Sequence, residues 1–193
     1  MPTLDLRPLF LSAVFAGLAV VVSLPAAADD RPPVLKAGEP MPRLEGDFLT
    51  GKRAVLPDAA RGKVALVALG FTYDSRFAVE AWGAWFKTRF GGRPDATYYE
   101  VPMMGRAARL GRFFIDRGMR NNTPKDAHDH VVTVYGDTGA WKTRVGFSDA
   151  RDRDAYLLLL GPDGVVTWMH SGPFDEAKAA ALGQAAEGLL AAR

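Results

Sequence analysis

The sequence predicts an α/β fold in which helices flank a central mixed β-sheet. Residues 64–71 form a continuous aliphatic run, which is typical of a strand buried on both faces. Strand-like and helix-like segments alternate after it, and the last third of the chain combines a β-hairpin with a C-terminal helix. This order is expected for a sheet covered by helices in a layered sandwich.

Local patterns predict each element of this fold. In chain order, we expect an edge strand at 54–56, a strand at 64–71, a helix at 76–90, a strand at 97–101, a helix at 105–117, a strand at 130–135, hairpin strands at 156–160 and 165–169, and a helix from 173 to about 191. Asp74 or Ser75 is a suitable N-cap for the first helix, which stops at the two glycines 91–92.

Turn residues predict the hairpin and the last helix. Gly161-Pro162-Asp163-Gly164 separates two apolar segments and is typical of a turn between antiparallel strands. Pro173 opens the final alanine-rich helix, and Ser171 or Gly172 lies near its cap.

The N-terminus resembles a secretory signal. Residues 9–24 are almost uninterruptedly apolar, follow Arg7, and precede a small-residue segment that ends Ala26-x-Ala28. This run of 16 residues is shorter than the roughly 20 needed to span a bilayer, which favours cleavage after residue 28 over an uncleaved membrane anchor. We therefore expect a signal peptide at 1–28, a proline-rich leader outside the core at 29–43, and one domain at 44–193.

Composition excludes one large class of chemistry. The 193 residues include no cysteine, so the chain has no thiolate with which to exchange disulfides or reduce peroxides. The net charge of only +2 does not favour a nucleic-acid partner. We also expect no cofactor.

Several short motifs resemble the peroxiredoxin and thioredoxin-like superfamily. They are Gly38-Glu39-Pro40-Met41-Pro42, Gly62-Lys63-Val64, and Tyr156-Leu157 leading to the turn at 161–164. The resemblance implies a thioredoxin-like sandwich with its reactive thiol between the strand at 64–71 and the next helix, where this chain has Asp74 and Ser75. It also implies a cis-proline before the hairpin strand, but here Asp154-Ala155 precedes Tyr156.

A narrower resemblance is to the cysteine-less family that includes the mitochondrial ATP-synthase assembly factor. It rests on the tryptophan-containing segment 80–86, on Tyr99-Glu100-Val101-Pro102, and on a helix that carries Arg106, Arg109 and Arg112. This resemblance implies that the protein assists the assembly of a membrane complex and does not catalyse redox chemistry.

Two candidate sites suggest other functions. Ser75, with Asp74, would act as a nucleophile in a thiol-independent enzyme if a histidine lay within hydrogen-bond reach, whereas helix capping is its ordinary role. His128 and His130 alternate on the predicted strand entry and would share a metal ion if they faced the same side, whereas a solvated strand entry is the simpler interpretation.

Two helices offer candidate partner-binding residues. Apolar residues cover so much of helix 76–90 that Trp82 and Trp85 are either fully buried or exposed as partner contacts. Arg106, Arg109 and Arg112 form a basic row, with Leu110, Phe113 and Phe114 as the apolar side of their helix. This row is either a solvated face or a contact for anionic lipid headgroups or an acidic partner.

These observations together favour an exported, redox-inactive binding module. We expect its partner to be a protein, such as an inner-membrane complex or its subunits, with an anionic membrane surface as a further contact. Metal carriage and thiol-independent catalysis are the alternatives.

Overall fold

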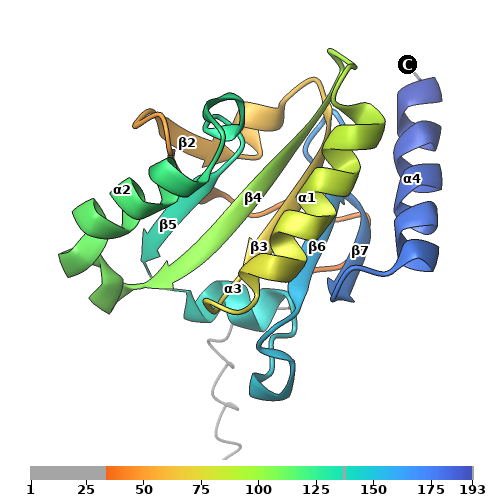
Figure 1. Cartoon of the computed structure of the whole chain (residues 1–193). Coiled ribbons are helices and arrows are strands. Elements are labelled where there is room, and N and C mark those ends of the chain that lie inside the picture. The colour runs from red at the N-terminus through yellow and green to blue at the C-terminus, as the bar shows by residue number, and fades with distance from the viewer. Residues whose placement is uncertain (1–33, 137, 193) are drawn as a thin grey trace, which may run out of the picture. The chain divides into compact units, whose positions relative to one another are not determined.

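The computed structural model describes residues 34–136 and 138–192, so the predicted signal peptide lies outside the described residues. Seven strands form one sheet in the order β2-β1-β5-β4-β3-β6-β7 (Figure 1). The strands are β1 (Leu44–Phe48), β2 (Arg53–Leu56), β3 (Val64–Gly70), β4 (Ala96–Gly105), β5 (Val132–Gly136), β6 (Ala155–Leu160) and β7 (Val166–Gly172). The helices are α1 (Arg76–Phe90), α2 (Arg112–Asn122), α3 (Gly139–Arg144) and α4 (Glu176–Ala191), with short 3-10 helices that include η2 (Arg106–Gly111) and η4 (Asp149–Arg151).

The sheet is mixed, as the sequence predicts. β3 pairs in parallel with β4, and β4 with β5, whereas β6 and β7 form the predicted antiparallel hairpin beside β3. Strand β2 lies at one edge of the sheet. The predicted α/β class with a central mixed sheet is confirmed.

Strand β3 separates two apolar cores. Its residues Val64, Leu66 and Ala68 pack on the side of α1 and α4, and the alternate residues pack with Trp141 of α3 on the other side. All seven β3 residues are buried, which explains why this strand reads as a continuous apolar run.

Residues 29–43 are predicted to form a leader outside the core. For the described part of this segment, residues 34–43, that prediction is wrong. Leu35 and Met41 are buried in the core. The backbone N–H of Gly38 donates to the Val166 carbonyl (2.7 Å), and that of Met41 donates to the Gly164 carbonyl (2.9 Å). This segment packs against the start of β7, so its prolines do not keep it outside the fold.

Two further local expectations need correction. The cap of α4 is Asp175, whose carboxylate accepts from the Lys178 N–H (2.8 Å), and is neither Ser171 nor Gly172. The predicted helix at 105–117 is η2 followed by α2, which extends to Asn122. No helix within the described residues is both long and apolar enough to cross a membrane.

Candidate functional site

The loop between β3 and α1 holds a closed pair of hydroxyl side chains. The Thr72 N–H donates to Oγ of Ser75 (3.2 Å), and the Ser75 N–H donates to Oγ1 of Thr72 (3.1 Å). The Ser75 hydroxyl donates in turn to the Thr72 carbonyl (2.9 Å). Ser75 is fully buried, and a Cβ at Gly70 would crowd its hydroxyl at 2.7 Å. This is the position at which the resemblance implies a reactive thiol.

The geometry does not prepare Ser75 for nucleophilic attack. Its hydroxyl proton is directed at a carbonyl oxygen, and no hydrogen bond in the described residues joins it to a histidine. Ser75 occupies the predicted N-cap position of α1, but its side chain makes no cap hydrogen bond to the helix. Asp74 is exposed, and its Oδ2 lies 3.7 Å from Nε of Arg153.

Thr72 is the residue that sequence reasoning missed. Besides accepting from the Ser75 N–H, its hydroxyl donates to the carbonyl of Asp152 (2.7 Å), in the segment that precedes β6. A signal for Thr72 is present in the sequence. Two residues separate Thr72 from Ser75, which is the spacing of the cysteines in a Cys-x-x-Cys motif.

An exposed aromatic group adjoins this closed pair in the chain. The Tyr73 and Phe77 side chains are 75% and 60% exposed. The guanidinium of Arg76 lies between them, 3.7 Å from the Tyr73 ring centroid and 4.4 Å from that of Phe77. We call Tyr73, Arg76 and Phe77 the aromatic rim. Cation–π contacts hold it together on the surface, although such rings would be expected to be buried.

A small cavity lies beside the rim, between α1, β4 and α2. Its volume of about 80 Å³ is well below the 300–1,000 Å³ of typical ligand pockets. Glu80 and Glu100 line it together with Ser75 and Met119. Burial, and then the charge of Glu80, raise the pKa of Glu100 to about 7. The cavity therefore holds an acid that titrates near neutrality but has little room for a substrate.

The two histidines of the metal hypothesis have separate partners. They lie in a turn before β5 and not on a strand, so the predicted alternation on one face is wrong. Nε2 of His128 contacts the carbonyl oxygens of Arg120 (3.2 Å) and Thr123 (3.0 Å). His130 stacks on the Tyr98 ring at 4.4 Å and contacts its carbonyl. The described residues contain no group of three ligands that could hold a metal ion.

Burial also decides the role of the tryptophans. Trp82 is fully buried and donates from Nε1 to the Gly172 carbonyl (3.3 Å). The prediction that Trp82 is a candidate partner contact is therefore wrong. Trp85 is partly buried against α4, where a Cβ at Gly183 would lie 3.3 Å from its ring. Both rings serve the packing of α1.

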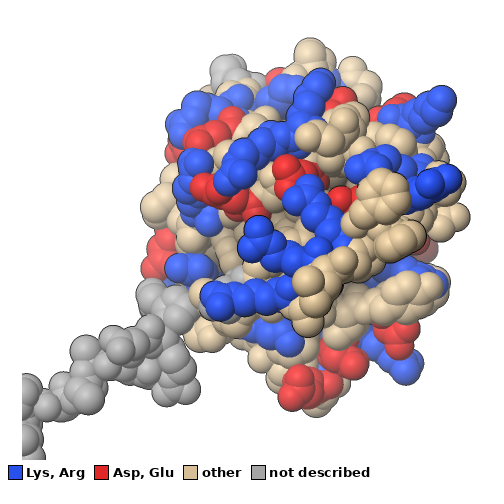
Figure 2. Space-filling view, turned by 90° about the vertical axis from the view of Figure 1, so that its left-hand side faces the viewer, with Lys and Arg blue, Asp and Glu red and all other residues tan. Residues whose placement is uncertain are grey.

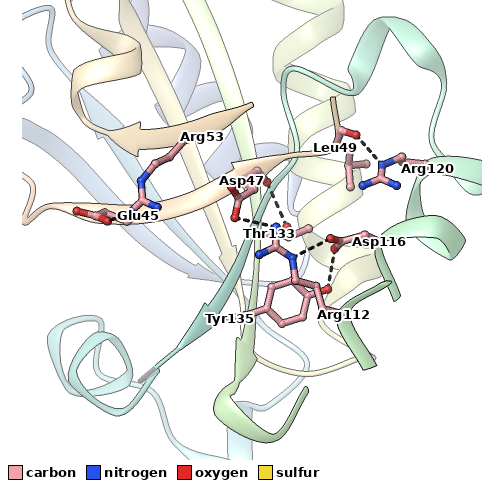
Figure 3. Close-up of polar contacts among 9 residues, drawn as sticks. All are labelled: Glu45, Asp47, Leu49, Arg53, Arg112, Asp116, Arg120, Thr133 and Tyr135. Atoms are coloured by element: carbon pink, nitrogen blue, oxygen red, sulfur yellow. Dashed lines mark hydrogen bonds and ion pairs between the residues drawn. The ribbon is translucent and has the colours of Figure 1, made fainter. Parts of the chain in front are cut away.

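The arginine row divides into two parts. Arg112 faces the domain, where it pairs with Asp47 of β1 (2.9 Å) and Asp116 of α2 (3.2 Å) (Figure 3). Asp116 is buried and also accepts from the Tyr135 hydroxyl (2.7 Å). The hydrogen bond to Asp116 raises the pKa of Arg112. Arg106 and Arg109 are exposed, so the predicted row is not one continuous basic face.

Comparison with solved structures identifies the architecture. A protein described as thiol:disulfide interchange protein DsbE from Chlorobium tepidum has a TM-score of 0.55 and 17% identity, over 81% of this chain and 99% of that one. The chain has a thioredoxin-like fold. The thioredoxin domain of a thiol-disulfide oxidoreductase from Bacteroides vulgatus also has a TM-score of 0.55, with 16% identity over 78% of this chain and 97% of that one.

A third similar structure is BsSco, a member of the Sco family of cytochrome c oxidase assembly proteins. It has a TM-score of 0.51 and 14% identity, over 80% of this chain and 98% of that one. No family model and no curated protein match the sequence. The comparisons therefore do not support the narrower resemblance to the ATP-synthase assembly factor. At these identities they establish the thioredoxin-like fold, here in a chain without cysteine.

Proposed function

We propose that this chain is an exported, redox-inactive thioredoxin-like protein that binds another protein through its aromatic rim and so assists the assembly of a membrane complex. The observation that carries this proposal is the exposure of Tyr73 and Phe77 around the closed Thr72–Ser75 pair. Exposed rings with an arginine between them have the composition of an interface hot spot, in which tyrosine and arginine are enriched.

The position of the rim supports recognition over chemistry. The rim borders the site where a thiol would act, but the buried Ser75 hydroxyl is directed inward. The adjoining cavity of about 80 Å³ is too small for a typical metabolite. A partner would therefore contact the surface around the former reaction site without entering it.

Two further observations support export and assembly. The N-terminal order of charge, apolar run and small residues is that of a secretory signal. The Sco family member with the same fold is named as an assembly protein for cytochrome c oxidase, which makes assembly a reasonable role for a chain that lacks thiols. Among residues 34–136 and 138–192, no contact favours the metal-carrier or enzyme alternatives.

Site-specific photo-crosslinking in cells tests the protein contact. A photoreactive residue is placed at Tyr73 or Phe77, with exposed Ala180 of α4 as the control position. We expect one protein to be captured from both rim positions and not from position 180. Purified, that protein should bind the unmodified chain at least about tenfold more tightly than the Tyr73→Ala/Phe77→Ala variant, because each ring is a hot-spot candidate.

Two results would overturn the proposal. One is capture of the same proteins from position 180 as from the rim. The other is unchanged affinity after both rings are removed, provided that the variant retains the thermal midpoint of the unmodified protein. The retained midpoint is expected, because both side chains are largely exposed.

A further inference from the structure

The 3-10 helix η2 and the first turn of α2 expose three large apolar side chains. Leu110 in η2 is 97% exposed, and Phe113 and Phe114 in α2 are 66% and 77% exposed. The two phenylalanine rings contact each other edge to face at 5.4 Å. We call these three residues the apolar cluster. They form the predicted apolar side of their helix, but this side is exposed, and such a cluster on a surface marks an interaction site.

Helix α2 is held in this orientation by polar contacts on its opposite side. Arg112 and Asp116 face the domain and join Asp47 and Tyr135, as Figure 3 shows. One turn further on, Arg120 donates to the Leu49 carbonyl (2.7 Å). An ordinary surface helix turns its apolar stripe toward the core, whereas α2 turns charged residues inward and phenylalanines outward. The exposure of the apolar cluster is therefore built into the fold.

The surroundings of the apolar cluster are basic. Residues 106–122 contain five arginines and a single acid, Asp116, which is buried. Arg109 is exposed and adjoins Leu110 in the chain, and Arg117 is exposed three and four positions after the phenylalanines, which places it beside them on the helix surface. Figure 2, which views the side of the molecule where α2 lies, shows Lys and Arg side chains gathered across this face.

We infer that this surface binds an anionic phospholipid bilayer. Leu110, Phe113 and Phe114 enter the interface between headgroups and acyl chains, and Arg109 and Arg117 contact the phosphates. Apolar side chains flanked by arginines are the combination that holds helices at anionic membrane surfaces. The side chains of the apolar cluster are 66–97% exposed, so they form a projecting surface.

The bilayer contact is independent of the protein contact proposed above, because the two use different side chains. A loss of lipid binding on changing the apolar cluster would leave crosslinking from Tyr73 and Phe77 intact. Likewise, a loss of crosslinking on changing the aromatic rim would leave lipid binding intact, because the aromatic rim and the apolar cluster share no residue.

Vesicle co-sedimentation tests the bilayer contact. It uses residues 29–193, the chain predicted after cleavage, because Arg31–Arg193 forms a compact unit that contains both cores. The vesicles contain phosphatidylcholine either alone or mixed with phosphatidylglycerol. We expect binding to the anionic vesicles at least about tenfold stronger than to the neutral ones, and weakened by salt.

Three variants separate the contributions of the phenylalanines and the arginines to vesicle binding. Phe113→Ser/Phe114→Ser and Arg109→Gln/Arg117→Gln should each weaken binding to the anionic vesicles at least about tenfold. The control Lys63→Gln/Lys178→Gln removes the same charge from exposed positions on other elements and should leave binding nearly unchanged. The thermal midpoints of all three variants should stay within a few degrees of that of the unmodified protein, because the changed side chains are exposed.

Three results would overturn the inference. They are an equal loss of binding in the lysine control, unchanged binding after removal of the phenylalanines, and no measurable binding to the anionic vesicles. The last result would leave an acidic protein as the occupant of this surface.

Discussion

Gly83 on α1 lies directly against the carboxyl group of Glu100 on β4, and a Cβ at position 83 would overlap Oε1 of that side chain. The glycine therefore leaves room for a carboxyl group between the helix and the sheet. The same carboxyl group borders the small cavity beside the aromatic rim. A glycine, which is an unfavourable residue in a helix interior, thus determines how an acidic group is accommodated near the β3–α1 loop.

The fit of Gly83 to Glu100 predicts a strong coupling between the two positions. In a Glu100→Ala background, Gly83→Ala should stabilise the fold by about 1 kcal/mol, because alanine is the better helix former. In the unmodified protein the same change should give no gain or a loss, because the new methyl group displaces the glutamate. Urea unfolding of the double-mutant cycle measures the difference. Equal effects of Gly83→Ala in both backgrounds would contradict this packing.

Glu100 also predicts a pH dependence of stability. Its pKa is raised to about 7 by burial and then by Glu80, so between about pH 4.5 and 7 the folded state holds a proton that the unfolded state has released. Stability should therefore fall as the pH rises through this window. The free energy of unfolding of the unmodified protein, relative to Glu100→Gln, should decrease by at most about 3 kcal/mol, since each pKa unit corresponds to about 1.4 kcal/mol.

Glu80→Gln provides the control for this dependence. Removing the neighbouring charge should lower the pKa of Glu100 and narrow the pH window, while the contribution of burial persists. The raised pKa of Glu100 would be ruled out if the free energy of unfolding of the unmodified protein, relative to Glu100→Gln, stayed constant or increased with pH.

The hydrogen-bonded pair in the β3–α1 loop predicts a structural role for Ser75. Ser75→Ala removes both the donor to the Thr72 carbonyl and the acceptor of the Thr72 N–H, in a fully buried position. We expect a loss of about 1–3 kcal/mol, measured by thermal or urea unfolding. The adjacent Asp74→Ala should change stability by no more than about 0.5 kcal/mol, because Asp74 is exposed. Equal losses in the two variants would argue against this role.

The inward arginine of α2 should matter more for stability than an outward one. Arg112→Ala leaves buried Asp116 without its guanidinium partner and also unpairs Asp47. Because Arg112 itself is partly exposed, we expect a loss of about 1–2 kcal/mol, below the range for fully buried pairs. Arg117→Ala on the same helix should stay within about 0.5 kcal/mol. The comparison is made by urea unfolding, and similar losses would show that the network in Figure 3 does not hold α2 in place.

The parts of the fold predicted from sequence are those whose pattern is local. Strand β3 is recognisable because both of its faces are buried, and the hairpin because its turn residues fix the geometry at Gly161–Gly164. The sequence does not predict strand β1, because Leu-Glu-Gly-Asp-Phe has little strand character. It forms because it pairs with β2 and with β5 far along the chain, and a Cβ at its Gly46 would lie only 2.6 Å from the Thr133 carbonyl oxygen.

The sequence predicts the position of the candidate site but not its hydrogen bonds. The sequence located the loop at Asp74 and Ser75, but the reciprocal hydrogen bonds with Thr72 depend on the path of the loop. On α2, helical spacing suggested an ordinary amphipathic helix. The pairing of Arg112 with Asp47, which lies 65 positions earlier in the chain, reverses which side faces the core, and no local pattern contains that information.

The central structural claim is that the β3–α1 loop brings Thr72 and Ser75 into direct contact at the spacing of a Cys-x-x-Cys motif. The Thr72→Cys/Ser75→Cys variant tests it most directly, because the chain has no other cysteine. Air oxidation should convert the two thiols to one intramolecular disulfide, measured by thiol titration and by the loss of two hydrogens in the intact mass. The control Tyr73→Cys/Ser75→Cys should keep its thiols, since Tyr73 is directed to solvent. A folded Thr72→Cys/Ser75→Cys variant that retains both free thiols would contradict the account.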